Sequence, residues 1–101
     1  MAHRLNSPEV DAFQKTQLAH LKTLGYAELL AMARSERISA PSDIQGIEFW
    51  IERRVGEAGG VRIEARACRR SFFIFMSCRC PGFEMLPDGT VVPDIDETPD
   101  D

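Results

Sequence analysis

The sequence predicts an α+β domain in which two N-terminal helices pack against a small antiparallel sheet, a meander of three to five strands. Apolar residues at helical spacing occupy the first third of the chain, while β-branched and aromatic residues separated by glycine-containing turns follow from residue 47. A chain of 101 residues forms one core rather than two. We therefore expect a single domain over residues 1–93, followed by a tail over residues 94–101.

The first helix is predicted to begin after Ser7, whose hydroxyl accepts from free backbone donors, with Pro8 at the first helical position. Its apolar arc ends before Gly25 and contains Val10, Phe13, Leu18, Leu21 and Leu24. The same spacing continues from Tyr26 to Ala33 and predicts a second helix of about ten residues. Residues 37–46 contain Pro41 and are predicted to form a connection.

The segment from Ser42 to residue 56 fits two patterns. Apolar residues alternate at Ile47, Phe49 and Ile51, as in a strand, but a capping box at Ser42 also allows a helix. We favour the strand, in a hairpin whose loop is residues 58–60.

This loop sets a register for the hairpin. It places Arg54 opposite Glu64 and Glu52 opposite Arg66. A shift of two residues in the pairing sum would instead place Glu52 opposite Glu64. Because opposite charges attract across a strand pair, we expect the first register.

The apolar run Phe72–Met76 predicts a strand with apolar side chains on both faces. Such a strand needs cover on both sides, so we expect a homodimer with Phe73 and Phe75 in its interface. The stretch "LPDGT" then predicts a turn at Pro87–Gly89 between two short strands.

Charge is distributed unevenly along the chain, whose net charge is −4. Residues 53–83 carry seven arginines and two acidic side chains, whereas residues 84–101 carry seven acidic side chains and no basic one. A tail that is rich in like charge and poor in apolar residues is expected to be disordered.

Three cysteines lie within this basic segment. Cys78 and Cys80 share one face of a strand, and Cys68 lies beside them if the chain turns near Ser71. Zinc bound by three thiolates and His20 is an alternative, but the sequence lacks a second C-x-x-C type pair. We predict no metal and no cofactor, and reduced cysteines buried as small apolar residues. The N-terminus lacks the apolar segment of a signal peptide, which predicts a cytoplasmic location.

No catalytic motif with a defined mechanism occurs in the sequence. We therefore expect a small non-enzymatic domain that binds and occludes another protein, of which an immunity or inhibitor protein is one form. The predicted contact residues are Trp50, Arg54, Arg66 and Arg70, because tryptophan and arginine are enriched in interfaces. The alternative is a single-stranded nucleic-acid binder with an arginine-rich sheet face, gated by the acidic tail. Nucleic acid is the weaker alternative because the chain carries net negative charge.

Overall fold

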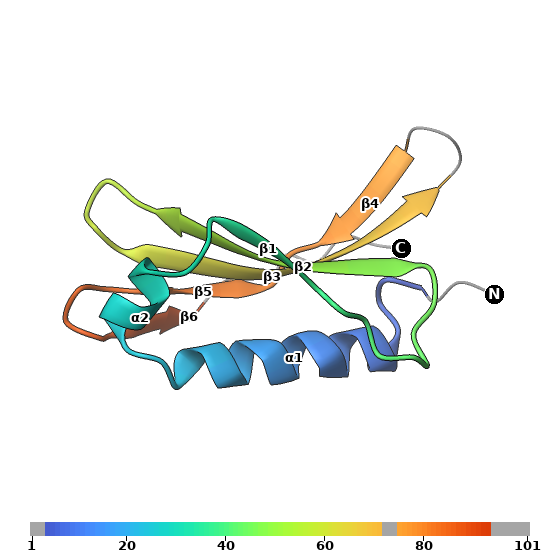
Figure 1. Ribbon diagram of the computed structural model, residues 1–101, viewed down its shortest axis with the longest axis horizontal. Helices are drawn as coiled ribbons and strands as arrows, with labels where there is room; N and C mark the ends of the chain where they lie inside the picture. The colour runs from blue at the N-terminus through green and yellow to red at the C-terminus, as the bar shows by residue number, and fades with distance from the viewer. Residues whose placement is uncertain (1–3, 72–74, 94–101) are drawn as a thin grey trace.

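The computed structural model describes residues 4–71 and 75–93 and has two layers, with the helices on one side of an antiparallel sheet (Figure 1). The predicted α+β fold is confirmed. The elements are α1 (Pro8–Lys22), α2 (Tyr26–Leu30), β1 (Ser35–Ile38), β2 (Ile47–Val55), β3 (Val61–Ser71), β4 (Phe75–Arg79), β5 (Gly82–Met85) and β6 (Val91–Pro93).

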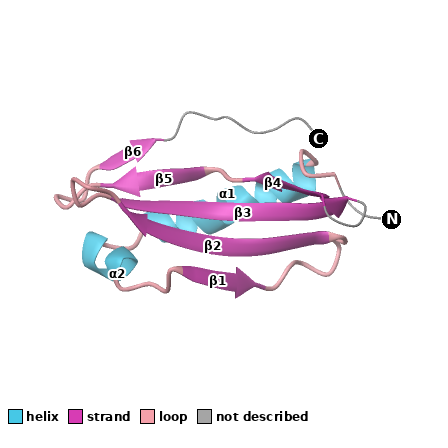
Figure 2. Cartoon of the chain, turned by 90° about the horizontal axis from the view of Figure 1, so that it is seen from above, coloured by secondary structure: helices cyan, strands magenta, loops and turns pink. Residues whose placement is uncertain are grey.

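The sheet is a meander in the order β1-β2-β3-β5-β6, with β4 also paired to β3 (Figure 2). β4 and β5 pair with different halves of the same edge of β3, and both keep one register. They are therefore two parts of one strand position, interrupted at Cys80 and Pro81. Within the described residues, six strands fill five positions across the sheet.

The face of the sheet toward α1 holds the core. Side chains at alternate positions of β2 and β3 are buried there, as the period-two pattern predicts. Ser7 caps α1 by accepting from the backbone N–H of Val10 at 3.4 Å, and Pro8 occupies the first turn as predicted. The residues buried on this face of β2 and β3 are Ile47, Phe49, Ile51, Val61, Ile63, Ala65 and Ala67.

A buried glutamine of α1 supplies a hydrogen bond that the sheet lacks. Gln14 is 1% exposed, and its Nε2 donates to the carbonyl oxygens of Ala65 at 2.7 Å and Arg79 at 3.1 Å. Ala65 donates its N–H to the carbonyl of Pro81, but Pro81 has no N–H to return the bond. Gln14 supplies that missing donor, which explains a polar residue within the apolar arc of the helix.

The second helix is shorter than predicted, and a strand was missed after it. α2 ends at Leu30, and Arg34 already accepts a backbone hydrogen bond from Arg53 of β2. β1 follows, and only its last two residues lie within the range 37–46 that was predicted to be a connection. This edge strand has four residues, mostly exposed, so it lacks the apolar alternation by which a strand is detected.

The 47–55 segment is a strand, as favoured, but the predicted hairpin loop was displaced by one residue. The loop is residues 57–59, closed by the N–H of Gly56 donating to the carbonyl of Gly60 at 2.8 Å. Gly59 has a φ of 88°, the left-handed conformation that a three-residue hairpin loop requires at its last position. The hairpin of β5 and β6 has the same kind of three-residue loop, in which Gly89 has a φ of 91°. This confirms the predicted turn at 87–89.

The predicted register of this hairpin was wrong. Glu52 lies opposite Glu64 and Arg54 lies opposite Arg62, two residues away from the expected pairing sum. A two-residue shift leaves every side chain on the same face, so the apolar pattern does not distinguish the registers. The turn decides the register, and the glutamates find partners elsewhere: Glu52 diagonally with Arg66 and Glu64 along its own strand with Arg62.

Two predicted features fall partly or wholly beyond the described residues. Phe75 and Met76 of the apolar run 72–76 begin β4, and Phe75 is paired with Ser71. Residues 72–74, which include Phe73, lie outside the described residues. The acidic tail over residues 94–101 also lies outside. The homodimer based on Phe73 and Phe75 stays a prediction.

Candidate functional site

The second face of the sheet, here called the open face, lies opposite α1. Both helices pack on the other side, and no helix of residues 4–71 and 75–93 covers the open face (Figure 1). Strand alternation and pairing assign its side chains. They are Ser35, Arg37, Glu48, Trp50, Glu52, Arg54, Arg62, Glu64, Arg66, Cys68, Arg70, Met76, Cys78, Cys80, Glu84 and Val92.

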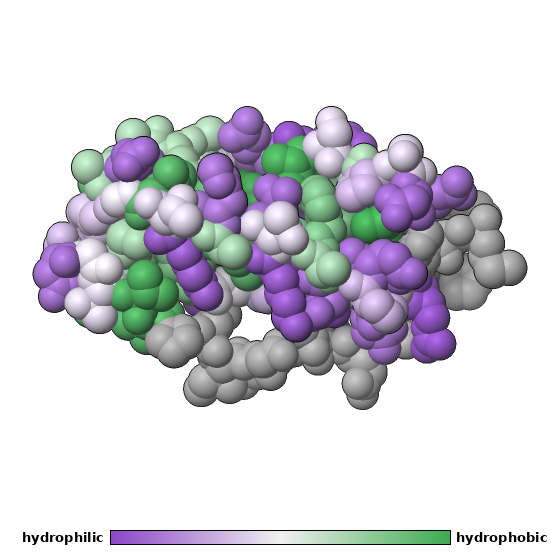
Figure 3. Space-filling view, turned by 90° about the horizontal axis from the view of Figure 1, so that it is seen from below, coloured by the Kyte–Doolittle hydropathy of each residue, from purple (hydrophilic) through white to green (hydrophobic). Residues whose placement is uncertain are grey.

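The opposite side of the molecule, which carries α1, has a different surface. Hydrophilic side chains are spread over it, and apolar side chains form separate small groups rather than one continuous patch (Figure 3). A surface of this kind is typical of a solvated helix layer. The open face is therefore the better candidate for a binding surface.

Like charges lie side by side across the open face. Arg37, Trp50 and Arg66 form one row across β1, β2 and β3, and the next row contains Glu52 and Glu64. Charges alternate from row to row along the strands, so attraction acts between rows instead of within them. This arrangement could not be found by matching opposite charges directly across strands.

Ion pairs between the rows neutralise most of these side chains. Arg66 contacts Glu52 at 2.9 Å and Arg62 contacts Glu64 at 3.0 Å, both in partly buried surroundings. The pair Arg37–Glu48 is looser, at 3.7 Å, and the Arg37 side chain is 67% exposed. The open face is thus fixed by ion pairs at its centre and has freer cations at its edge.

Trp50 lies at the centre of the open face and is partly exposed. The guanidinium of Arg37 lies over its ring, 5.9 Å from the centroid, and Arg66 is its partner on β3. A partly exposed tryptophan between two arginines presents an aromatic surface and guanidinium donors together. Both are enriched where proteins bind one another.

Arg66 connects the charged rows to the cysteines. Its Nε donates to Cys80 Sγ at 3.3 Å, and one of its terminal nitrogens contacts Glu52. The hydrogen bond to Cys80 raises the pKa of Arg66, and Glu52 adds to this increase, whereas burial opposes it. The guanidinium is therefore held between a carboxylate and a sulfur atom.

The expectation of three reduced cysteines was wrong for two of them. Cys68 and Cys78 lie directly opposite each other on β3 and β4 and form a disulfide, and Cys80 is free. The three cysteines share a sheet face as predicted, but the predicted burial is confirmed only for Cys68, because Cys78 and Cys80 are partly exposed. Spacing on the chain could not show that Cys68 and Cys78 are opposed, because this depends on the register of a hairpin.

The structure does not bring together the four residues of the zinc alternative. Cys68 and Cys78 are joined to each other, and His20 lies exposed on α1, on the other side of the sheet. Within residues 4–71 and 75–93, no group of three or more histidine, cysteine, aspartate or glutamate side chains is placed to hold a metal ion.

The four predicted contact residues share the open face but are spread along it. Trp50 and Arg66 are direct neighbours, while Arg54 lies two rows away beside Arg62. Arg70 is exposed at the far end of β3, opposite Met76. Trp50 and Arg66 form the centre of the site, and sequence reasoning missed Arg37 because its strand was not predicted.

Two arginines of the basic segment have structural roles instead. Arg79 points toward α1, where it is paired with Asp11 and donates to the carbonyl of Leu5 at 3.4 Å. Arg53 Nε donates to the carbonyl of Met32 at 2.7 Å, just after α2. The positive charge counted along the sequence is thus larger than the positive charge that the open face presents.

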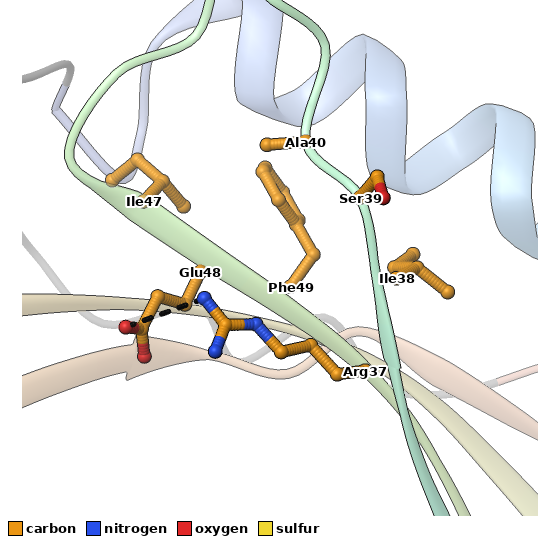
Figure 4. A pocket seen from close by; sticks show the side chains of 7 residues that line it. All are labelled: Arg37, Ile38, Ser39, Ala40, Ile47, Glu48 and Phe49. Atoms are coloured by element: carbon orange, nitrogen blue, oxygen red, sulfur yellow. Dashed lines mark ion pairs between the residues drawn. The ribbon is translucent and has the colours of Figure 1, made fainter.

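A cavity of about 430 Å³ lies where β1 separates from β2 (Figure 4). Its apolar lining includes Ile47 and Phe49, which are only 5% and 1% exposed, and the Arg37–Glu48 pair lies at its edge. Of its apolar walls only Ile38 and Ala40 are open to solvent, so a small ligand would bury little apolar area there. We do not assign the cavity a ligand.

Comparisons with protein-family models, with curated proteins and with solved structures found nothing that matches the chain. Its function therefore has to be argued from its own residues. In the part of the chain that the structure describes, neither helix has the length and apolar composition needed to cross a bilayer.

Proposed function

We propose that the chain is a small, non-enzymatic protein-binding domain whose open face docks on another protein and occludes it. The observation that carries the proposal is the partly exposed Trp50, flanked by Arg37 and Arg66 at the centre of a sheet face that no described helix covers. An immunity or inhibitor protein is one form of such a domain. A cytoplasmic location belongs to the same proposal.

The charge of the open face favours a protein partner over nucleic acid. Its strands present five arginines, and four glutamates lie among them. Several of these form the ion pairs described above, so few guanidinium groups are available to phosphates. A nucleic-acid site needs an excess of positive charge along the path of the backbone. A mixed surface with a central aromatic side chain is more typical of a protein interface.

The test compares two variants in a binding assay. A tagged chain is used to isolate partners from native extract with and without nuclease treatment, and the affinity of the purified partner is then measured for each variant. Trp50→Ala is expected to weaken binding at least about tenfold, the loss typical of a central contact residue. Leu30→Ala is the matched control, because Leu30 is an exposed apolar side chain of α2 that lies away from the open face.

Three results would contradict the proposal. Equal loss of affinity in both variants would place the contact elsewhere, and unchanged affinity in both would do the same. Recovery of nucleic acid, with proteins lost after nuclease treatment, would instead support the nucleic-acid alternative. Light scattering of the purified chain separately tests the predicted homodimer.

A further inference from the structure

The three cysteines form one group of sulfur atoms on the open face. Cys68 and Cys78 are joined across β3 and β4, and Cys80 lies two residues after Cys78, so its side chain points to the same side. Cys68 is 5% exposed, whereas Cys78 and Cys80 are partly exposed. A free thiol thus lies next to the more accessible sulfur of a disulfide.

The surroundings of Cys80 suit a nucleophile. Arg66 Nε donates to its sulfur at 3.3 Å, and Glu52 holds the guanidinium in place at 2.9 Å. These contacts fix the position of the free thiol beside the disulfide, and exchange proceeds by attack of a cysteine sulfur on a disulfide sulfur.

Cys80 can reach Cys78 when the backbone between them shifts. Two residues of a strand span about 6.7 Å between Cα atoms, which is near the upper limit for a disulfide. Pro81 follows Cys80 and interrupts the hydrogen bonds between β3 and the β4–β5 position. The backbone of Arg79 sets this span, and Arg79 is paired with Ala67 and accepts from Gln14, so the exchange requires the Ala67–Arg79 pair beside the interruption to open.

We propose that Cys80 is an internal exchange thiol that moves the disulfide from Cys68–Cys78 to Cys78–Cys80. The Cys80 thiolate attacks Cys78 Sγ, and the bond between Cys78 and Cys68 breaks. Cys68 leaves with the electron pair and takes up a proton. One sulfur–sulfur bond breaks and one forms, so no oxidant or reductant is consumed.

The exchange changes both the position and the accessibility of the disulfide. The link between β3 and β4 is replaced by a link within the chain segment 78–80, which includes the two partly exposed sulfurs. In that form the disulfide is open to thiols from solution, such as glutathione or a cysteine of another protein. Disulfides in cytoplasmic proteins are usually transient and redox-active, so this chemistry is compatible with the proposed location.

The first experiment maps disulfides in the unmodified chain. The oxidised protein is equilibrated at pH 8, quenched with acid to protonate the thiols and stop exchange, alkylated in denaturant at low pH, and digested for mass spectrometry. We expect the label on Cys80 in one fraction of molecules and on Cys68 in another. Label on Cys80 alone at all equilibration times would overturn the proposal, and so would label on all three cysteines before any reductant is added.

The second experiment uses a matched pair of variants in a glutathione redox buffer. Cys68→Ala leaves Cys78 and Cys80, and we expect an intramolecular disulfide between them. Cys78→Ala leaves Cys68 and Cys80, which are not directly opposed, and we expect two thiols that stay unlinked.

Circular dichroism shows whether each variant is folded. If Cys68→Ala is folded and keeps two free thiols, or if both variants form the link equally, the proposal fails. Neither experiment involves a partner protein, so failure here and failure of the proposed protein binding are separate results.

Discussion

The two faces of the sheet are built from alternate residues of the same strands, yet they follow different rules. The covered face of β2 and β3 is mostly apolar and buried against the helices, with Arg53 and Arg69 toward its ends, and the open face of these strands carries rows of charge around one tryptophan. Neighbouring residues such as Phe49 and Trp50 therefore belong to different environments. The covered face thus stabilises the fold, whereas the open face holds side chains that can contact a partner.

Replacing Phe49 tests this division most strongly. Phe49→Ala removes a ring that is 1% exposed and packs edge-on against Phe13, and should lower the free energy of unfolding by about 3–5 kcal/mol. Trp50→Ala, on the other face, should lower it by only about 1 kcal/mol. Urea denaturation of both variants measures the difference. Equal losses would show that the open face also contributes strongly to stability.

The link between α1 and the interrupted strand gives the next largest effect. Gln14→Leu should lower the free energy of unfolding by about 1–3 kcal/mol, because the buried carbonyl of Ala65 loses its donor. In a chain that also carries Pro81→Ala, the backbone N–H gained at position 81 can donate to the carbonyl of Ala65. Gln14→Leu should then lower the free energy of unfolding by less. A double-mutant cycle by urea denaturation measures this coupling. A cost that is the same in both backgrounds would mean that Gln14 does not substitute for the missing N–H.

The ion pair between Arg79 of β4 and Asp11 of α1 should appear in the pH dependence of stability. A hydrogen bond from Lys15 lowers the pKa of Asp11 below its ordinary value of 3.8; Arg79 lowers it further, and burial opposes both. Since the folded pKa is depressed, the stabilisation is present above about pH 3.8 and is lost as the pH falls through the folded pKa.

The matching variant is Asp11→Asn. It should be less stable than the unmodified chain at pH 7, and the two unfolding free energies should converge as the pH falls below 3.8. Thermal melts at a series of pH values check this. A stability difference that stays constant down to pH 2 would contradict it.

Ion pairs on the open face should give the smallest effect. Glu52→Gln removes the carboxylate that Arg66 contacts at 2.9 Å and that Arg54 contacts at 3.9 Å. It should lower the free energy of unfolding by only about 0–1 kcal/mol. The cost should shrink as salt is added. Glu57→Gln, in the exposed hairpin loop, is the control and should change nothing. A large, salt-independent loss for Glu52→Gln would show that these charges help to hold the sheet together.

Local patterns in the sequence determined much of the fold. The Ser7-Pro8 start of α1, the apolar alternation of β2 and the turn at Pro87–Gly89 all depend on residues close together in the chain. Each follows from backbone conformations that particular residues favour, so each was predictable.

Tertiary structure alone decided what depends on contacts between distant segments. β1 is a strand only because β2 offers it an edge, and Gln14 is buried because Pro81, far along the chain, leaves a carbonyl without a donor. The register placed Glu52 opposite Glu64, because turn geometry outweighs charge pairs of a fraction of a kcal/mol. The same level of structure brought Cys68 and Cys78 together and set Cys80 beside Arg66. Spacing along one strand shows which face a side chain takes, but not what lies across from it.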